Sequence, residues 1–105
     1  MIIRGGENLY PIEIDNYLLE HPVVLEVAVF GLPDKTYDEE CCAVARVDLT
    51  IINNPDELRD WCKKRISRWK VPRYIFFIDS FPVTPSGKIQ KYKLQEQYIQ
   101  DLNLN

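Results

Sequence analysis

Two loops near opposite ends of the chain combine glycine with charged or polar side chains. One is residues 4–8 (Arg-Gly-Gly-Glu-Asn), and the other is residues 82–89 (Pro-Val-Thr-Pro-Ser-Gly-Lys-Ile). In the second loop Gly87 precedes Lys88. Glycine lets a loop approach a ligand closely because it has no Cβ, and a lysine ammonium attracts phosphate or carboxylate oxygens. A turn with a solvated lysine has the same local sequence, so the pattern alone leaves both interpretations open.

Other common kinds of site do not fit these residues. A phosphate-binding loop of the Walker type needs a longer glycine spacing and a Ser or Thr after the lysine, and neither loop has both. The chain has one histidine, three cysteines and no Cys-x-x-Cys pair, which argues against a zinc site. The odd number of cysteines also argues against a disulfide framework and favours a reducing compartment. We therefore expect no metal site in this chain.

The charge distribution argues against general nucleic-acid binding. The net charge is −3, but residues 63–73 carry six cations and no acid. Such a basic segment on an acidic domain can contact the phosphates of a small ligand, or it can be a solvated helix end. We find no signal peptide and no apolar run long enough to span a membrane.

The chain of 105 residues has the length of one domain. Residues 2–9 predict a glycine hairpin, and Pro11 suits the first position of a helix. Apolar runs at 25–30, 41–47 and 74–78 predict strands, the first ending at Gly31, Pro33 and Asp34. Asn54 and Pro55 predict the start of a helix whose apolar spacing continues to Trp69, and a last helix begins near Lys91. The result is a small α+β domain, a roughly three-stranded sheet flanked by helices plus a short N-terminal hairpin.

Several stretches together resemble the C-terminal domain of the AMP-forming acyl-CoA synthetases, whose superfamily includes luciferases and peptide-synthetase adenylation domains. The resemblance covers about residues 2–96, and within the family it is closest to medium-chain fatty acyl-CoA ligases. The matching stretches are residues 2–14 (Ile-Ile-Arg-Gly-Gly-Glu-Asn-Leu-Tyr-Pro-Ile-Glu-Ile), 21–29 (His-Pro-Val-Val-Leu-Glu-Val-Ala-Val), 31–34 (Gly-Leu-Pro-Asp), 70–74 (Lys-Val-Pro-Arg-Tyr) and 81–91 (Phe-Pro-Val-Thr-Pro-Ser-Gly-Lys-Ile-Gln-Lys).

The resemblance implies a catalytic role for Lys88. In this family a carboxylate attacks the α-phosphate of ATP, and coenzyme A thiol then displaces AMP from the acyl-AMP. The lysine of the Ser-Gly-Lys loop enters the active site in the first step, and here it is Lys88. Its ammonium would bridge carboxylate and phosphate oxygens as negative charge gathers on them. Gly87 would let the loop approach closely.

The resemblance also implies a substrate-binding role for the first loop. Gly5 and Gly6 match the loop that lines the passage for the pantetheine arm of coenzyme A, and Arg4 could add charge there or serve the hairpin structurally. The basic segment 63–73 would lie near the nucleotide phosphates of coenzyme A. The family usually has glycine where Asp38 stands. Because aspartate tolerates left-handed conformations better than most residues, we expect the turn to persist.

We therefore expect residues 1–105 to be the C-terminal lid domain of an acid–CoA ligase that lacks its large N-terminal adenylation domain here. The full enzyme would use ATP, Mg²⁺ and coenzyme A on a fatty or aryl acid. The isolated domain would be inactive and bind no cofactor by itself. Its partners would be the large domain, acyl-AMP and coenzyme A, in the cytoplasm or, in a eukaryote, the mitochondrial matrix. The alternative is a stand-alone, non-catalytic domain that binds a partner protein or an acyl carrier.

Overall fold

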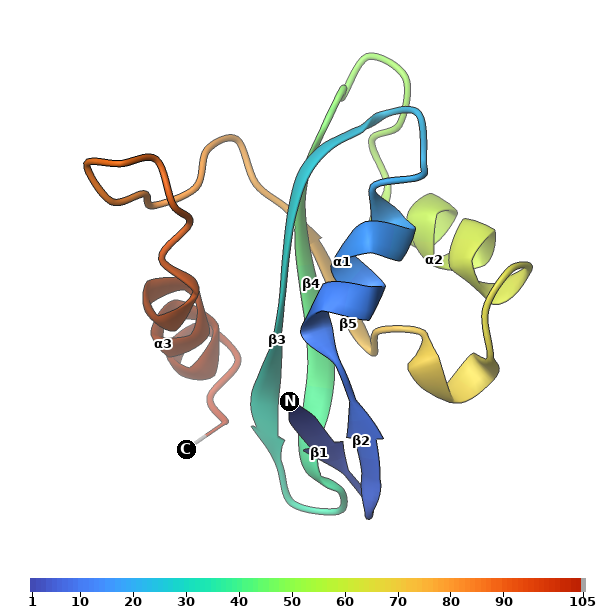
Figure 1. The fold of residues 1–105 in the computed structure, drawn as a ribbon, viewed down its shortest axis with the longest axis vertical. Helices are drawn as coiled ribbons and strands as arrows, with labels where there is room; N and C mark the ends of the chain where they lie inside the picture. Colours follow the sequence, from blue (N-terminus) through green and yellow to red (C-terminus); the bar gives the residue numbers. More distant parts are fainter. Residues whose placement is uncertain (105) are drawn as a thin grey trace.

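The computed structural model describes residues 1–104, which form one five-stranded sheet with helices on both faces (Figure 1). The chain begins with strands β1 (Ile2–Arg4) and β2 (Glu7–Leu9) and helix α1 (Pro11–Leu18). The long strands β3 (Val24–Asp34) and β4 (Asp38–Val47) follow, and then helix α2 (Pro55–Lys63). The 3₁₀ helix η1 (Arg68–Lys70), strand β5 (Tyr74–Phe77) and helix α3 (Lys91–Asp101) complete the domain. The α+β class expected from the sequence is confirmed.

The antiparallel pair β3–β4 forms the centre of the sheet. The strand order is β2-β1-β4-β3, and β5 pairs in parallel with β4. The N-terminal hairpin joins the sheet through a single register pair, Arg4 with Asp38, so it continues the predicted three-stranded sheet. Among the described residues, the outer edge of β3 therefore has no strand beside it.

Alternating side chains of β3 and β4 divide the core into two clusters. Cys41 belongs to the cluster covered by α1 and α2, and its neighbour Cys42 belongs to the cluster covered by α3. This opposite orientation was expected, because successive side chains of a strand point to opposite faces. Figure 1 shows the same arrangement, with α3 on one side of the sheet and the other two helices on the opposite side.

The prediction that Gly31, Pro33 and Asp34 end the first long strand is wrong. β3 continues through all three, and its ladder pairs Pro33 with Glu39. A proline lacks a backbone N–H, but a strand at the edge of a sheet tolerates it on its unpaired side. The turn lies one step further, where the Asp34 carboxylate accepts hydrogen bonds from two backbone N–H groups of the turn. Asp38 follows with φ of +69°, which confirms the expected left-handed tolerance.

The predicted helix starts are confirmed, but one helix is shorter than its apolar pattern. The Asn54 side chain accepts a hydrogen bond from the backbone N–H of Asp56 at 2.9 Å and so caps α2. α2 ends at Lys63, and Trp69 belongs to η1. Pro72 disfavours helical backbone at the residue before it, and Val71 is extended with φ −68° and ψ 127°. Helical backbone therefore could not continue past η1 into β5.

Candidate functional site

A tight turn at residues 84–88 presents Lys88. The backbone N–H of Thr84 donates to the Lys88 carbonyl oxygen at 2.8 Å, and the Lys88 N–H donates to Thr84 Oγ1 at 3.1 Å. Gly87 closes the turn with φ of +89°, a conformation that favours glycine. Val83 and Ile89 pair as an isolated antiparallel bridge below the turn. The turn is therefore well defined although most of its residues are exposed.

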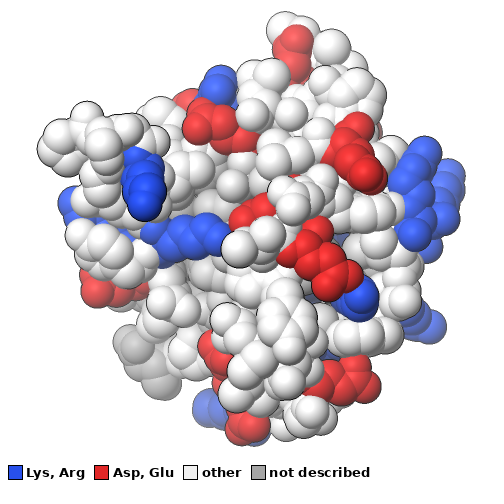
Figure 2. Space-filling view, in the orientation of Figure 1, with Lys and Arg blue, Asp and Glu red and all other residues white. Residues whose placement is uncertain are grey.

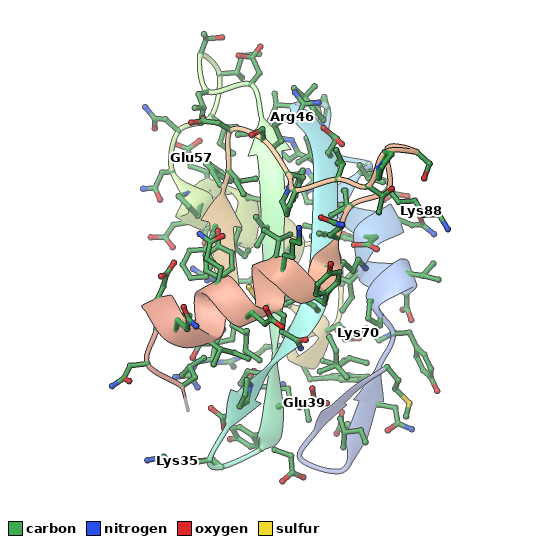
Figure 3. All side chains as sticks on the ribbon, turned by 90° about the vertical axis from the view of Figure 1, so that its left-hand side faces the viewer. Lys35, Glu39, Arg46, Glu57, Lys70 and Lys88 are labelled. Carbon is green, nitrogen blue, oxygen red and sulfur yellow. The ribbon has the colours of Figure 1, made fainter. Side chains whose placement is uncertain are left out.

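The side chain of Lys88 extends from this turn toward solvent. Lys88 is exposed, and its side chain projects away from the body of the domain (Figure 3). Within residues 1–104 its ammonium forms no ion pair and no side-chain hydrogen bond. A flexible, unpaired ammonium at the end of an ordered turn can contact an anion supplied by another domain or by a substrate.

The glycine loop between β1 and β2 is held differently at its two glycines. Gly5 has φ of +56°, and its N–H donates to the Tyr37 carbonyl oxygen at 2.8 Å. A Cβ at Gly5 would lie 3.0 Å from the Tyr37 ring, a tight contact that adds to the preference of this backbone conformation for glycine. Gly6 has φ of +85°, but a Cβ there would meet no atom within 4 Å. Gly6 therefore borders open space.

Arg4 is engaged by residues of this chain. Its Nε donates to Glu40 Oε2 at 2.9 Å, its NH1 donates to the Trp69 carbonyl oxygen at 3.1 Å, and its guanidinium lies 5.2 Å from the Tyr37 ring centroid. Glu40 is only 1% exposed, so this ion pair is largely buried. Of the two roles considered for Arg4 from the sequence, these contacts provide the structural one.

Arg4 and part of the basic segment border one hollow of about 420 Å³, here named the basic hollow. Its lining residues are Arg4, Tyr37, Glu40, Arg59, Lys63, Arg68, Val71, Pro72 and Arg73. Five of these nine side chains are cations, and the acid among them is Glu40. Glu40 Oε1 has no hydrogen-bond partner among the described residues, and Arg73 NH1 is 3.9 Å from it. The hollow suits a ligand with several negative charges.

The structure gathers some of the sequence-predicted residues and separates others. Arg4 and three cations of the basic segment meet at the basic hollow, beside the glycine loop, whereas the Lys88 turn lies toward the other end of the molecule (Figure 1). In Figure 2, Lys and Arg side chains gather beside the Lys88 turn and over the end of α2, with acidic side chains between them. Sequence reasoning missed Glu40 and Arg59. Arg59 lies four residues before Lys63 in the predicted helix, and this spacing could have placed both cations on one helix face.

Within the part of the chain that the structure describes, neither a thiol nor a metal cluster offers an alternative catalytic group. The three cysteines are buried and free, and burial raises the pKa of Cys41 to about 12 and of Cys62 to about 11. Such thiols are inert nucleophiles at neutral pH. Over residues 1–104 there is no group of three His, Cys, Asp or Glu side chains that could hold a metal ion.

No helix in the same range is both long and apolar enough to cross a membrane.

Comparisons with known proteins agree on one family. The model of the protein family described as "AMP-binding enzyme C-terminal domain" matches residues 13–88. The chain is 50% identical over 105 residues to the protein YngI of Bacillus subtilis, and 48% identical over 104 residues to the mouse mitochondrial medium-chain acyl-CoA ligase ACSF2. It covers 19% and 17% of these two relatives, so it spans less than a fifth of their length.

Solved structures give the same result. A Mycobacterium tuberculosis fatty acyl CoA synthetase superposes with a TM-score of 0.88 at 40% identity, covering 96% of this chain and 20% of that one. A Brucella canis acyl-CoA synthetase superposes with a TM-score of 0.86 at 34% identity, covering 96% of this chain and 19% of that one.

Proposed function

The chain belongs to the AMP-binding enzyme C-terminal domain family, and from that premise we propose that it works as the lid of an AMP-forming fatty acid–CoA ligase. The observation that carries this proposal is the exposed Lys88 on an ordered Thr84–Lys88 turn, with no ion pair to its ammonium among residues 1–104. The chemistry needs a mobile cation, because both reactants of the first step are anions.

In the first step, a carboxylate oxygen attacks the α-phosphorus of ATP, the bond to the β-phosphate oxygen breaks, and acyl-AMP and pyrophosphate form. Lys88 contributes by bridging the carboxylate and the α-phosphate oxygens while their charges converge. Its long stem lets the ammonium adjust to both oxygens. Gly87 contributes the positive-φ backbone that orients the turn, since a side chain at φ +89° would be strained.

In the second step, the thiol of coenzyme A attacks the acyl carbon and AMP leaves. The open space beside Gly6 would accommodate the pantetheine arm, whereas Gly5 keeps the loop closed against Tyr37. The basic hollow would receive the nucleotide phosphates of coenzyme A, since five cations line it and coenzyme A carries several negative charges. Arg4 would contribute charge to that hollow while it remains paired with Glu40.

The large adenylation domain would supply the ATP and acyl pockets. Mg²⁺ would bind there with ATP, since the described residues hold no cluster of metal ligands and we assign it none in this chain. The names of the ACSF2 relatives suggest a medium-chain fatty acid as the substrate.

The test uses the full-length enzyme with Lys88→Ala. We expect adenylation, measured by ATP–pyrophosphate exchange, to fall about 10²- to 10³-fold, the usual effect of removing one well-placed charge donor. Conversion of synthetic acyl-AMP and coenzyme A into thioester should stay near the wild-type rate. Lys35→Ala is the matched control, because Lys35 is also exposed and forms no ion pair within residues 1–104. Undiminished exchange in Lys88→Ala would contradict the assignment.

A further inference from the structure

The Lys91 side chain crosses the uncovered edge of β3. Its Nζ donates to the Val29 carbonyl oxygen at 3.0 Å and lies 3.3 Å from Asp15 Oδ2 in α1. One helical turn later, Gln95 Nε2 donates to the Gly31 carbonyl oxygen at 2.6 Å. Two side chains of α3 thus occupy two consecutive outward carbonyl groups of the edge strand.

The spacing of these contacts defines one register between helix and strand. Four residues of an α-helix rise about 6 Å, and two residues of a strand span about 6.6 Å. Lys91 and Gln95 are four apart, and Val29 and Gly31 are two apart. A shift of α3 by one residue along β3 would separate both side chains from their carbonyl partners. The buried apolar cluster around Leu94 would oppose such a shift less strongly, because apolar contacts are non-directional.

Asp15 makes the Lys91 contact specific. Its side chain is 18% exposed, and Oδ1 is buried without a hydrogen-bond partner among the described residues. Oδ2 meets Lys91 as its single described ion-pair partner. Burial raises the pKa of the Asp15 carboxyl, and the neighbouring ammonium of Lys91 opposes that shift. Loss of Lys91 would leave a largely buried carboxylate unpaired, so α1, β3 and α3 are tied at one point.

The Lys88 turn is separated from the Lys91 contact by only two residues. Lys91 is the first residue of α3 and lies three residues after Lys88. α3 has no side-chain cap at Gln90 and no acid in its first turn, so its N-terminus lacks the usual local anchors. Ile89 packs on the cluster covered by α3, and apolar contacts of this kind are non-directional.

We propose that Lys91, supported by Asp15 and Gln95, is a positioning residue that fixes where the ammonium of Lys88 is presented during adenylation. This inference rests on the proposed function, since it assumes that Lys88 serves the first step. A displacement of a catalytic group by about 1 Å can cost on the order of 10²-fold in rate. Lys91 would therefore affect adenylation without touching a substrate.

The test uses the full-length enzyme with Lys91→Met, which keeps an unbranched stem and removes the charge. We expect kcat of ATP–pyrophosphate exchange to fall about 10- to 100-fold with KM for ATP nearly unchanged. The thioester step from synthetic acyl-AMP should keep its wild-type rate. Lys91→Arg should restore most of the exchange, because a guanidinium can donate to both partners. Gln95→Met, which removes one carbonyl contact and no charge, should give a smaller loss of the same kind.

Lys93→Met is the control, because Lys93 is exposed in the same helical turn and forms no ion pair within residues 1–104. Equal loss of both half-reactions in Lys91→Met and Gln95→Met, together with a lower Tm, would overturn the proposal in favour of a purely structural contact. Unchanged ATP–pyrophosphate exchange in Lys91→Met would also overturn the positioning role of Lys91. In that case, a large loss of exchange in Lys88→Ala would still support the proposed function. Unchanged exchange in Lys88→Ala would remove both.

Discussion

The ion pair between Arg4 and Glu40 leads to a prediction about stability. We expect Arg4→Met to destabilise the domain, because methionine keeps much of the aliphatic stem but leaves Glu40 without its hydrogen-bonded partner. Glu40 is 1% exposed, Arg4 Nε is 2.9 Å from Oε2, and Oε1 has no hydrogen bond among the described residues. The Glu40 side chain would therefore stay buried without a hydrogen-bonded cation, and its remaining ion-pair partner among the described residues would be Arg73, at 3.9 Å.

The magnitude follows from the burial of the pair. Removing one partner of a buried ion pair typically costs about 3–5 kcal/mol. The Arg4 side chain is 28% exposed and Arg73 remains close, so water and the second guanidinium recover part of this cost. We expect a loss of about 2–3 kcal/mol in the free energy of unfolding. At about 4–8 °C per kcal/mol for a domain of this size, Tm should fall by roughly 10–20 °C.

The assay is urea unfolding of residues 1–105, followed by the fluorescence of the two tryptophans. Lys35→Met is the matched control, since Lys35 is exposed on the β3–β4 turn without an ion pair in the described range (Figure 3), and its effect should stay within about 0.5 kcal/mol. The double variant Arg4→Met/Glu40→Met should be more stable than Arg4→Met, because it removes the buried charge as well. If Arg4→Met unfolds within about 0.5 kcal/mol of wild type, the reasoning from burial is refuted.

Three further outcomes can be measured on the same chain. Asp38→Gly should raise the free energy of unfolding by about 0.5–1 kcal/mol, because Asp38 has φ of +69° and glycine adopts this backbone conformation without strain. A decrease in the free energy of unfolding would show instead that the Asp38 side chain stabilises the turn. The free energy of unfolding should fall as pH rises from about 9 toward 12, because the unfolded thiols ionise near 9.0 whereas burial holds the pKa of folded Cys41 at about 12 and of folded Cys62 at about 11. Iodoacetamide should label these thiols only when the domain unfolds, and rapid labelling of the native state at pH 8 would contradict their burial. The chain alone should catalyse no ATP–pyrophosphate exchange with any fatty acid, since the reactants need a large domain to hold them in register, and detectable exchange would disprove this.

Local sequence determined where most elements begin. Pro11 and Pro55 suit the first position of a helix, and Asn54 adds a side-chain cap, so both helix starts could be predicted from their own residues. The two-residue period of a strand was enough to predict that Cys41 and Cys42 face opposite sides of the sheet. The stretches that match the family, taken together from residue 2 to about residue 96, also sufficed to identify it, and the comparisons confirm the family. The catalytic role of Lys88 remains a prediction.

Tertiary structure decided where elements end and what each charge contacts. Gly31 and Pro33 indicate a turn by their local preferences, yet ladder pairing with β4 keeps both in a strand. The sequence left open whether Arg4 adds charge to a ligand site or serves the hairpin, because its partner Glu40 lies 36 residues away. In the same way, Lys91 meets Asp15 across 76 residues. Local preferences are worth about 1 kcal/mol or less per residue, whereas a strand ladder or a buried ion pair involves larger energies between residues distant in sequence. The local preferences can be predicted from the sequence pattern. The ladder and ion-pair contacts form only when the folded chain brings distant residues together.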